Sequence, residues 1–218
     1  MSRGTVAQHK LGKFGAASAV TIQSSIRGGG EGTIRVTVDY AQVPVPDAYY
    51  VADYARIEVS GAIVQITFGK LEGLHGNRLR NKLEVTIPAY AFMGQWMGSL
   101  EFIATLKKRM VEKGFPLYVA PKNVDETTEK VQTVHCNNSL VTGGEGECCA
   151  DLYFLSPRDI RFYLEKSETP QLEPLLRIIM ESKILVAIGE SFNEIADKLR
   201  DFVPKVDPDD RFGISEET

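Results

Sequence analysis

Apolar and polar residues alternate along the N-terminal half of this chain, and that alternation constrains its fold more than any other feature. Ile34, Val36 and Val38 are separated by Arg35 and Thr37, a pattern typical of a half-buried strand. Similar patterns predict further strands at residues 50–59, 63–68 and 79–87, with a tight turn at residues 60–61. Short connections of this kind favour an antiparallel sheet.

After Pro88 the apolar spacing lengthens to three and four residues, which predicts an amphipathic helix. Its apolar stripe comprises Phe92, Trp96, Leu100, Ile103, Leu106 and Met110. Gly114 and Pro116 follow the last of these residues, and both are typical of the end of a helix. The sequence therefore predicts a β-β-β-α module.

The remainder of the chain gives weaker signals. Residues 131–134 are expected to pair with residues 150–155, and the apolar run 184–188 predicts a buried strand. Ser191 with Glu194 predicts the capped start of a final helix. No internal repeat is evident from the motifs.

These patterns together predict an α+β fold, in which amphipathic helices cover a largely antiparallel sheet. Residues 1–32 are rich in Gly and Ser and predict a flexible basic arm. Residues 33–203 are expected to form one α+β domain, with the β-β-β-α module at 33–120 and a β/α extension at 121–203. Residues 204–218 form a predicted acidic tail.

The overall charge excludes some classes of protein. The chain has 25 Lys and Arg residues against 29 Asp and Glu residues, so it is not built as a whole to coat nucleic acid or an anionic membrane. Its longest apolar run, 184–188, is far shorter than the ~20 residues of a membrane-spanning helix. Three cysteines and an N-terminus without an apolar leader predict a reduced, cytoplasmic protein without membrane partners.

Part of the module resembles a known family. Residues 50–54 (Tyr-Val-Ala-Asp-Tyr), 66–69 (Ile-Thr-Phe-Gly) and 85–88 (Val-Thr-Ile-Pro), followed by a helix, resemble the small bacterial domain family of unknown function designated DUF3467. The resemblance covers about residues 49–115 and departs from the family pattern at Asp53 and Thr67, where Asn and Asp are usual. It implies a β-β-β-α module and no particular chemistry.

Two groups of residues could carry chemistry. His135, Cys136, Cys148 and Cys149 are soft ligands that zinc prefers, but adjacent ligands and the missing Cys-x-x-Cys spacing argue against a metal site. A cysteine with a histidine base is the alternative thiol chemistry, although nothing in the spacing selects the pair. Glycine clusters at 28–32 and 143–146 match no nucleotide-binding fingerprint, so we expect no cofactor. The ligand spacing likewise leads us to expect no metal.

The segment 70–82 is the most basic part of the predicted domain. Its cationic and imidazole side chains are Lys70, His75, Arg78, Arg80 and Lys82, and its glycines would let backbone amides approach a phosphate. The structural interpretation is a solvated hairpin loop with the last three cations on one outer strand face. Stacking aromatics are missing from the segment, which weakens a role in binding nucleic acid.

The residues favour a non-enzymatic protein-interaction or assembly subunit that uses its terminal arm and sheet edges to bind a protein partner or itself. Two alternatives remain open. One is an anion-binding or nucleic-acid-binding role for the segment 70–82, and the other is a thiol- or zinc-dependent enzyme that uses residues between His135 and Cys149.

Overall fold

The structure is a computed structural model of the whole chain. It describes residues 20–25, 33–38, 43–72, 77–119, 121, 123–126, 130–156, 158–159 and 171–199, with the backbone alone at residues 20–25, 33–38, 94–98 and 192–193. The predicted acidic tail, most of the predicted arm and His75 lie outside these residues.

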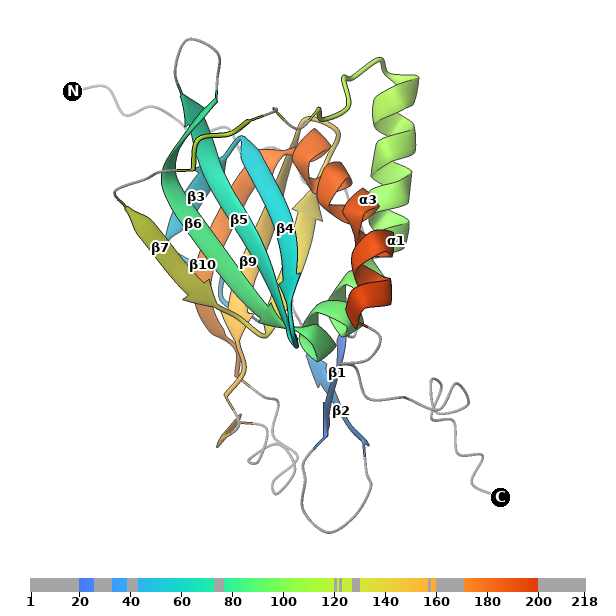
Figure 1. Cartoon of the computed structure of the whole chain (residues 1–218). Helices are drawn as coiled ribbons and strands as arrows, with labels where there is room; N and C mark the ends of the chain where they lie inside the picture. The colour runs from blue at the N-terminus through green and yellow to red at the C-terminus, as the bar shows by residue number, and fades with distance from the viewer. Residues whose placement is uncertain are drawn as a thin grey trace, which may run out of the picture.

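Two four-stranded sheets face each other (Figure 1). Sheet B has the order β3 (Tyr49–Ala52), β10 (Glu173–Glu181), β9 (Glu147–Phe154) and β8 (Asn138–Gly143). Sheet C has the order β4 (Tyr54–Ser60), β5 (Ile63–Glu72), β6 (Arg78–Pro88) and β7 (Val131–His135). Most neighbouring strands are antiparallel, but β3 runs parallel to β10 and β7 runs parallel to β6. The α+β class is confirmed, with two sheets where one was predicted.

The core lies between the two sheets, because each sheet turns its apolar face to the other. A cavity of about 20 Å³ remains there, room for about one water molecule. Its lining residues come from both sheets and from one helix: Ile66, Phe68, Val85, Ile87, Ser139, Val141, Ala150, Leu152, Ile178, Met180, Leu185 and Ile188. The residues are almost all apolar, so the cavity is a packing gap.

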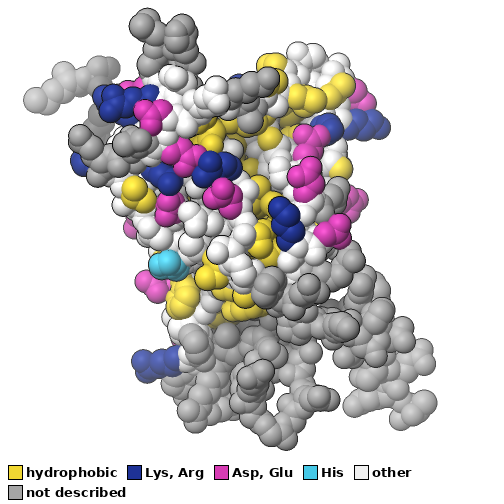
Figure 2. Space-filling view, viewed as in Figure 1, with side chains coloured by type: hydrophobic (Ala, Val, Ile, Leu, Met, Phe, Trp, Pro, Cys, Tyr) yellow, Lys and Arg dark blue, Asp and Glu magenta, His cyan; other side chains and the backbone are white. Residues whose placement is uncertain are grey.

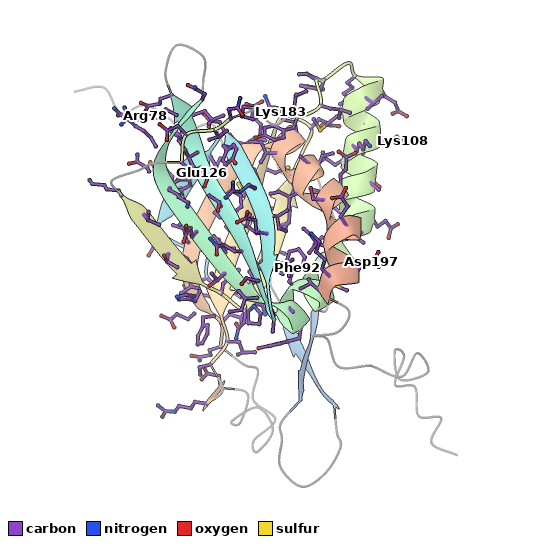
Figure 3. All side chains as sticks on the ribbon, viewed as in Figure 1. Arg78, Phe92, Lys108, Glu126, Lys183 and Asp197 are labelled. Atoms are coloured by element: carbon purple, nitrogen blue, oxygen red, sulfur yellow. The ribbon has the colours of Figure 1, made fainter. Side chains whose placement is uncertain are left out.

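Two long helices, α1 (Ala89–Glu112) and α3 (Ser182–Leu199), lie beside the sandwich at the edges of β4 and β8 (Figure 1). Phe92 and Ile103 of α1 are buried in the common core, and the label in Figure 3 places Phe92 at the lower end of α1, next to the sheets. The helix predicted after Pro88 is therefore α1, although the side chain of Trp96 lies outside the described residues. No helix in the described part of the chain is long and apolar enough to cross a membrane.

A separate two-stranded hairpin of β1 (Val20–Ser25) and β2 (Thr33–Val38) extends below α1 (Figure 1). The predicted strand at 33–38 is β2. Strand β1 falls within the segment that composition assigned to the arm, and its antiparallel register places Ile22 opposite Val36. Val20 likewise lies opposite Val38, whereas Ile34 lies opposite Ser24.

The chain contains a repeat of topology that its motifs conceal. We call residues 49–112 the first repeat and residues 131–199 the second repeat. Each has a short strand, an antiparallel three-strand meander and a long helix, in the same order. The short strand of each repeat leaves its own meander and pairs, in parallel, with the last strand of the other repeat: β3 with β10, and β7 with β6.

Three sequence predictions were wrong, the first two because of long-range strand pairing. The single strand predicted at 50–59 divides at Asp53 into β3 and β4, which belong to different sheets. Residues 131–135 pair with β6, not with residues 150–155. The apolar run 184–188 lies inside α3, and Ser191, predicted to cap a later helix, donates its hydroxyl to the Ala187 carbonyl one turn earlier.

Candidate functional site

The basic segment 70–82 is mostly strand, not loop. Strand β5 continues to Glu72 and β6 begins at Arg78, so Lys70 and Arg80 are cross-strand neighbours. Arg80 forms an ion pair with Glu72 at 2.9 Å, and Lys70 and Arg78 are exposed. Residues 70–72 and 78–82 of the predicted loop are therefore strand.

A β-bulge in β6 separates the cations that alternation had placed on one face. The register passes from Phe68 opposite Leu83 to Lys70 opposite Arg80, which leaves an extra residue in β6, and Asn81 has a positive φ of 48°. Cross-strand partners share a face, so Arg80 lies on the same face as Leu83. Lys82 lies on the opposite face, and the prediction of one cationic face was wrong.

Lys82 belongs to a charged network on the outer face of sheet C (Figure 2). Its ammonium lies 2.8 Å from Glu84 and 3.6 Å from Glu126, and its pKa is raised chiefly by the hydrogen bond to Glu84. Arg56 reaches the same Glu126 at 3.1 Å and Glu58 at 3.5 Å. Figure 3 shows Glu126 in front of this sheet. Carboxylates already hold both of these cations, which leaves less charge for an external anion.

The fold places His135 and Cys136 in one sheet's edge region, where the Cys136 N–H donates to the Thr86 carbonyl, and Cys148 and Cys149 in the other sheet. His135 ends β7 in sheet C, where its Nδ1 shares a hydrogen bond with the Thr86 hydroxyl. Cys148 and Cys149 lie on β9 in sheet B. In the described part of the chain, no three His, Cys, Asp or Glu residues gather as a metal site would require.

The thiols are held in their protonated form. Burial raises the pKa of Cys136 to about 12, and burial also raises the pKa of Cys148 and of Cys149. Cys148 is in the core, with its Sγ 3.1 Å from the Ser182 hydroxyl. A nucleophilic cysteine needs the opposite shift, toward the thiolate.

The outer face of sheet B holds one buried carboxylate. Asp151 accepts two hydrogen bonds from Arg177, one from Nε at 2.6 Å and one from Nη2 at 2.7 Å. The Asp151 side chain is 3% exposed and that of Arg177 is 30% exposed. This two-point contact joins neighbouring strands β9 and β10, and it is a structural pair because both partners are occupied by each other.

Each sheet also has one edge strand on the side away from the helices: β3 in sheet B and β7 in sheet C (Figure 1). No described strand pairs with the outer edge of either. Four of the five residues of β7 are exposed, with Val131 at 52%. In β3, Tyr49 is 70% exposed and Val51 is also exposed.

The hydrogen bonds of the ladder show which backbone groups face outward at these edges. The Cys136 N–H donates to the Thr86 carbonyl of β6. Because successive residues of a strand point their backbone groups to opposite sides, Thr133 and His135 turn theirs to the open edge. The Arg177 N–H donates to the Ala48 carbonyl, so Tyr49 and Val51 are the outward-facing residues of β3.

The two edge strands end at equivalent corners. At the first, the Asp53 N–H donates to the Gly69 carbonyl, and the Asp53 carboxylate accepts the Leu71 N–H at 2.7 Å. At the second, the Asn137 N–H donates to the Tyr153 carbonyl, and the Asn137 side chain accepts the Leu155 N–H at 2.7 Å. At each corner the chain passes from one sheet to the other.

The sequence does not reveal which sheet edges are open, because that depends on the parallel pairs between the repeats. No single residue could have revealed it. Comparison of the chain with family models, with curated proteins and with solved structures finds no match.

Proposed function

We propose that this protein is a non-enzymatic interaction module that binds extended segments of partner proteins along the edges of β3 and β7. The observation that carries the proposal is the exposure of β7, an edge strand whose Thr133 and His135 backbone groups face outward. An edge with unpaired N–H and C=O groups is a template for strand addition. Long edges are commonly protected against such pairing, and the described residues place no strand or helix over this one.

The two edges offer different side chains to a partner. Strand β3 presents the exposed Tyr49 and Val51, which suit apolar side chains of an added strand. Strand β7 presents Thr133 and His135 beside Val131, which suits a more polar segment. Backbone pairing supplies affinity in strand addition and the alternate side chains supply selectivity.

The two alternatives have less support. An anion-binding role for the segment 70–82 draws on Arg80 and Lys82, which lie on opposite faces and already contact carboxylates. A thiol-dependent or zinc-dependent enzyme draws on His135 and on cysteines whose thiols burial keeps protonated.

We also propose that the resemblance to the DUF3467 family extends to both repeats. The first repeat departs from the family pattern at Asp53 and Thr67. At the equivalent positions the second repeat has Asn137 and Asp151, which are the residue types that the pattern contains. The two repeats together therefore supply what the first repeat lacks.

A peptide-display screen tests the proposed binding mode with the full chain as bait. Selected peptides are synthesised, and their binding is titrated by fluorescence anisotropy while backbone hydrogen exchange is followed. We expect protection of the Thr133 and His135 amides, or of those of Tyr49 and Val51. Protection confined to other segments, or no selected peptide, would argue against the proposal.

Proline substitutions separate edge binding from folding. Thr133→Pro removes an outward N–H while the ladder to β6 stays intact, since proline is tolerated at such edge positions. It should weaken a β7-binding peptide at least tenfold, whereas Val51→Pro should weaken only a β3-binding one. Each variant serves as the control for the other, and circular dichroism checks that both remain folded. Equal loss of peptide affinity in both variants would contradict two separate binding edges. Self-assembly, measured by sedimentation at several protein concentrations, would identify a second copy of the chain as the partner.

A further inference from the structure

The two repeats match in detail that topology alone does not require. Strand β6 ends and α1 begins where the Ala89 N–H donates to the Ala62 carbonyl at 2.8 Å. Strand β10 ends and α3 begins where the Ser182 N–H donates to the Gly146 carbonyl at 3.3 Å. Together with the two equivalent corners, these contacts fix a residue-by-residue correspondence between the repeats.

The last two meander strands continue that correspondence through their irregularities. The register of β5 with β6 shifts after Phe68, and the register of β9 with β10 shifts at the equivalent Leu152. Exchange of the short strand is also reciprocal: β3 pairs with β10 from Arg177 to Met180, and β7 pairs with β6 from Lys82 to Thr86. A repeat that lends one strand and borrows another cannot complete its own sheet.

From this we infer that the two repeats of the chain pair like the unlike subunits of a heterodimer. Both have the same strand-exchanging topology, but their residues differ, and each repeat fits the other and not a second copy of itself. The partner surface of each repeat is its inner sheet face with the edge that receives the borrowed strand. This inference concerns the architecture and is independent of the proposed binding function.

Packing across the core supports the specificity of this pairing. The first repeat contributes Ile66 and Phe68 to the cavity wall, and the second repeat contributes Ala150 and Leu152 at the equivalent positions. Large residues thus face a common space with smaller ones. At the neighbouring positions Val85 corresponds to the larger Ile178, so the contrast is confined to β5 and β9. Two copies of the β5 residues would crowd this part of the space and two copies of the β9 residues would leave a gap in it, and both cost stability.

The borrowed strands differ in the same way. Tyr50 of β3 donates its hydroxyl to the Asn81 carbonyl in the bulge of β6, a bond that joins the two sheets. Its equivalent in β7 is Val134, which has no hydroxyl. Both Tyr50 and Asn81 belong to the first repeat, so a pair of second repeats would lose this link, whereas a pair of first repeats would keep it.

Ion pairs between the repeats are also one-sided. Lys113 of the segment after α1 contacts Glu145 at 3.0 Å, and Lys107 of α1 contacts Glu190 of α3. The positions equivalent to Glu145 and Glu190 in the first repeat are Gly61 and Met97. Exposed pairs such as these add little stability, but a pair of first repeats would lack both, so they favour the mixed pairing.

Cleavage of the folded full chain tests the inference. A protease recognition sequence is inserted between Thr127 and Thr128, and the folded protein is cut there. We expect the two fragments to elute together at the mass of the uncut chain and to melt in one transition. Separation without denaturant would overturn the inference.

Refolding of the cut chain tests specificity. After denaturation and dilution, native mass spectrometry should find the one-to-one pair of unlike fragments in at least tenfold excess over either pair of like fragments. Comparable amounts of all three species would contradict specific pairing.

A packing cycle in the uncut chain gives an independent measurement. Ala150→Ile gives the second repeat the equivalent residue of the first and should lower the melting temperature. Ile66→Ala should lower it as well, but the double variant should recover more than half of the Ala150→Ile loss. Additive losses would show that the two positions do not share a common space and would count against the complementary fit.

Discussion

Asn137 and Leu155 exchange two hydrogen bonds, in which the Asn137 side chain accepts the Leu155 N–H at 2.7 Å and donates to the Leu155 carbonyl at 2.8 Å. One side chain thus satisfies both backbone groups of a residue distant in sequence. The bonds hold the corner between β7 and β8, where the chain passes from sheet C to sheet B. A partly buried backbone group that loses its partner costs about 1–3 kcal/mol.

Asn137→Ala should therefore lower the free energy of unfolding by about 1–3 kcal/mol, because both Leu155 groups lose their partner. Asp53→Asn at the equivalent corner is the matched control and should change stability by less than about 0.5 kcal/mol, since an amide oxygen also accepts the Leu71 N–H. Urea unfolding of both variants measures the difference. Equal losses would show that the corner bonds are not what the substitutions remove.

The ion pair of Arg177 with Asp151 predicts an asymmetry between its two truncations. Arg177→Ala leaves a carboxylate that is 3% exposed without its bidentate partner, whereas Asp151→Ala leaves a guanidinium that is 30% exposed and reaches water. Breaking a buried pair costs about 3–5 kcal/mol, and we expect Arg177→Ala to approach that range. Asp151→Ala should cost less because solvent screens the remaining cation. Chemical unfolding of both variants gives the comparison, and the reverse order would contradict it.

Cys136 predicts a loss of stability in alkali. Its thiol has a pKa of about 12 when folded against 9.0 ordinarily, so above about pH 9 the unfolded chain releases a proton that the folded chain keeps. The free energy of unfolding should be independent of this group at low pH and fall as the pH rises from 9 toward 12. Cys136→Ala should reduce that slope between pH 9 and 10, measured by urea unfolding at each pH.

Tyrosines provide the control for that measurement. Burial, together with the nearby Asp53, raises the pKa of Tyr50 to about 12, and burial raises that of Tyr153 to about 12. Their ordinary value is 10.0, so their effect begins about one pH unit later than that of Cys136. Tyr50→Phe should leave the slope below pH 10 unchanged. A Cys136→Ala slope identical to that of the parent would argue that this thiol titrates normally.

The sequence predicted the first repeat well because its signals are local. Alternation fixed β4, β5 and β6, Gly61 with its φ of 57° marked their first turn, and Pro88 marked the change of period before α1. The division of one predicted strand at Asp53 could not be seen, since it depends on a bond to Leu71 across the next hairpin.

The second repeat was harder to predict for two physical reasons. An apolar run such as 184–188 suits either a buried strand or a buried helix, and here Ile184, Leu185 and Ile188 are buried on several sides of α3. Its residues also differ in type from those of the first repeat. The equivalence of the two repeats is therefore visible in their hydrogen bonds and not in their sequence motifs. Which sheet edges are open depends on the parallel pairing between the repeats, so the sequence could not show that either.

Gly189 offers a test in which the usual effect of a substitution should change sign. Glycine within a helix normally gains about 0.5–1 kcal/mol of stability when replaced by alanine. At Gly189 of α3, however, a Cβ would lie 2.7 Å from Cγ2 and 3.0 Å from Cδ1 of Ile103 in α1. The branched side chain sits in the buried core and cannot move away freely.

Gly189→Ala should therefore destabilise the protein by about 1–3 kcal/mol, the range for an overpacked core. Ile103→Ala creates room and loses apolar contact, but on that background Gly189→Ala should become neutral or stabilising. Gly146→Ala has open space around its Cβ and provides a control outside the helices. Thermal and urea unfolding of the parent, the two single variants at Gly189 and Ile103 and their double variant measure the coupling. A Gly189→Ala variant as stable as the parent would mean that α1 and α3 are not in close contact at this point.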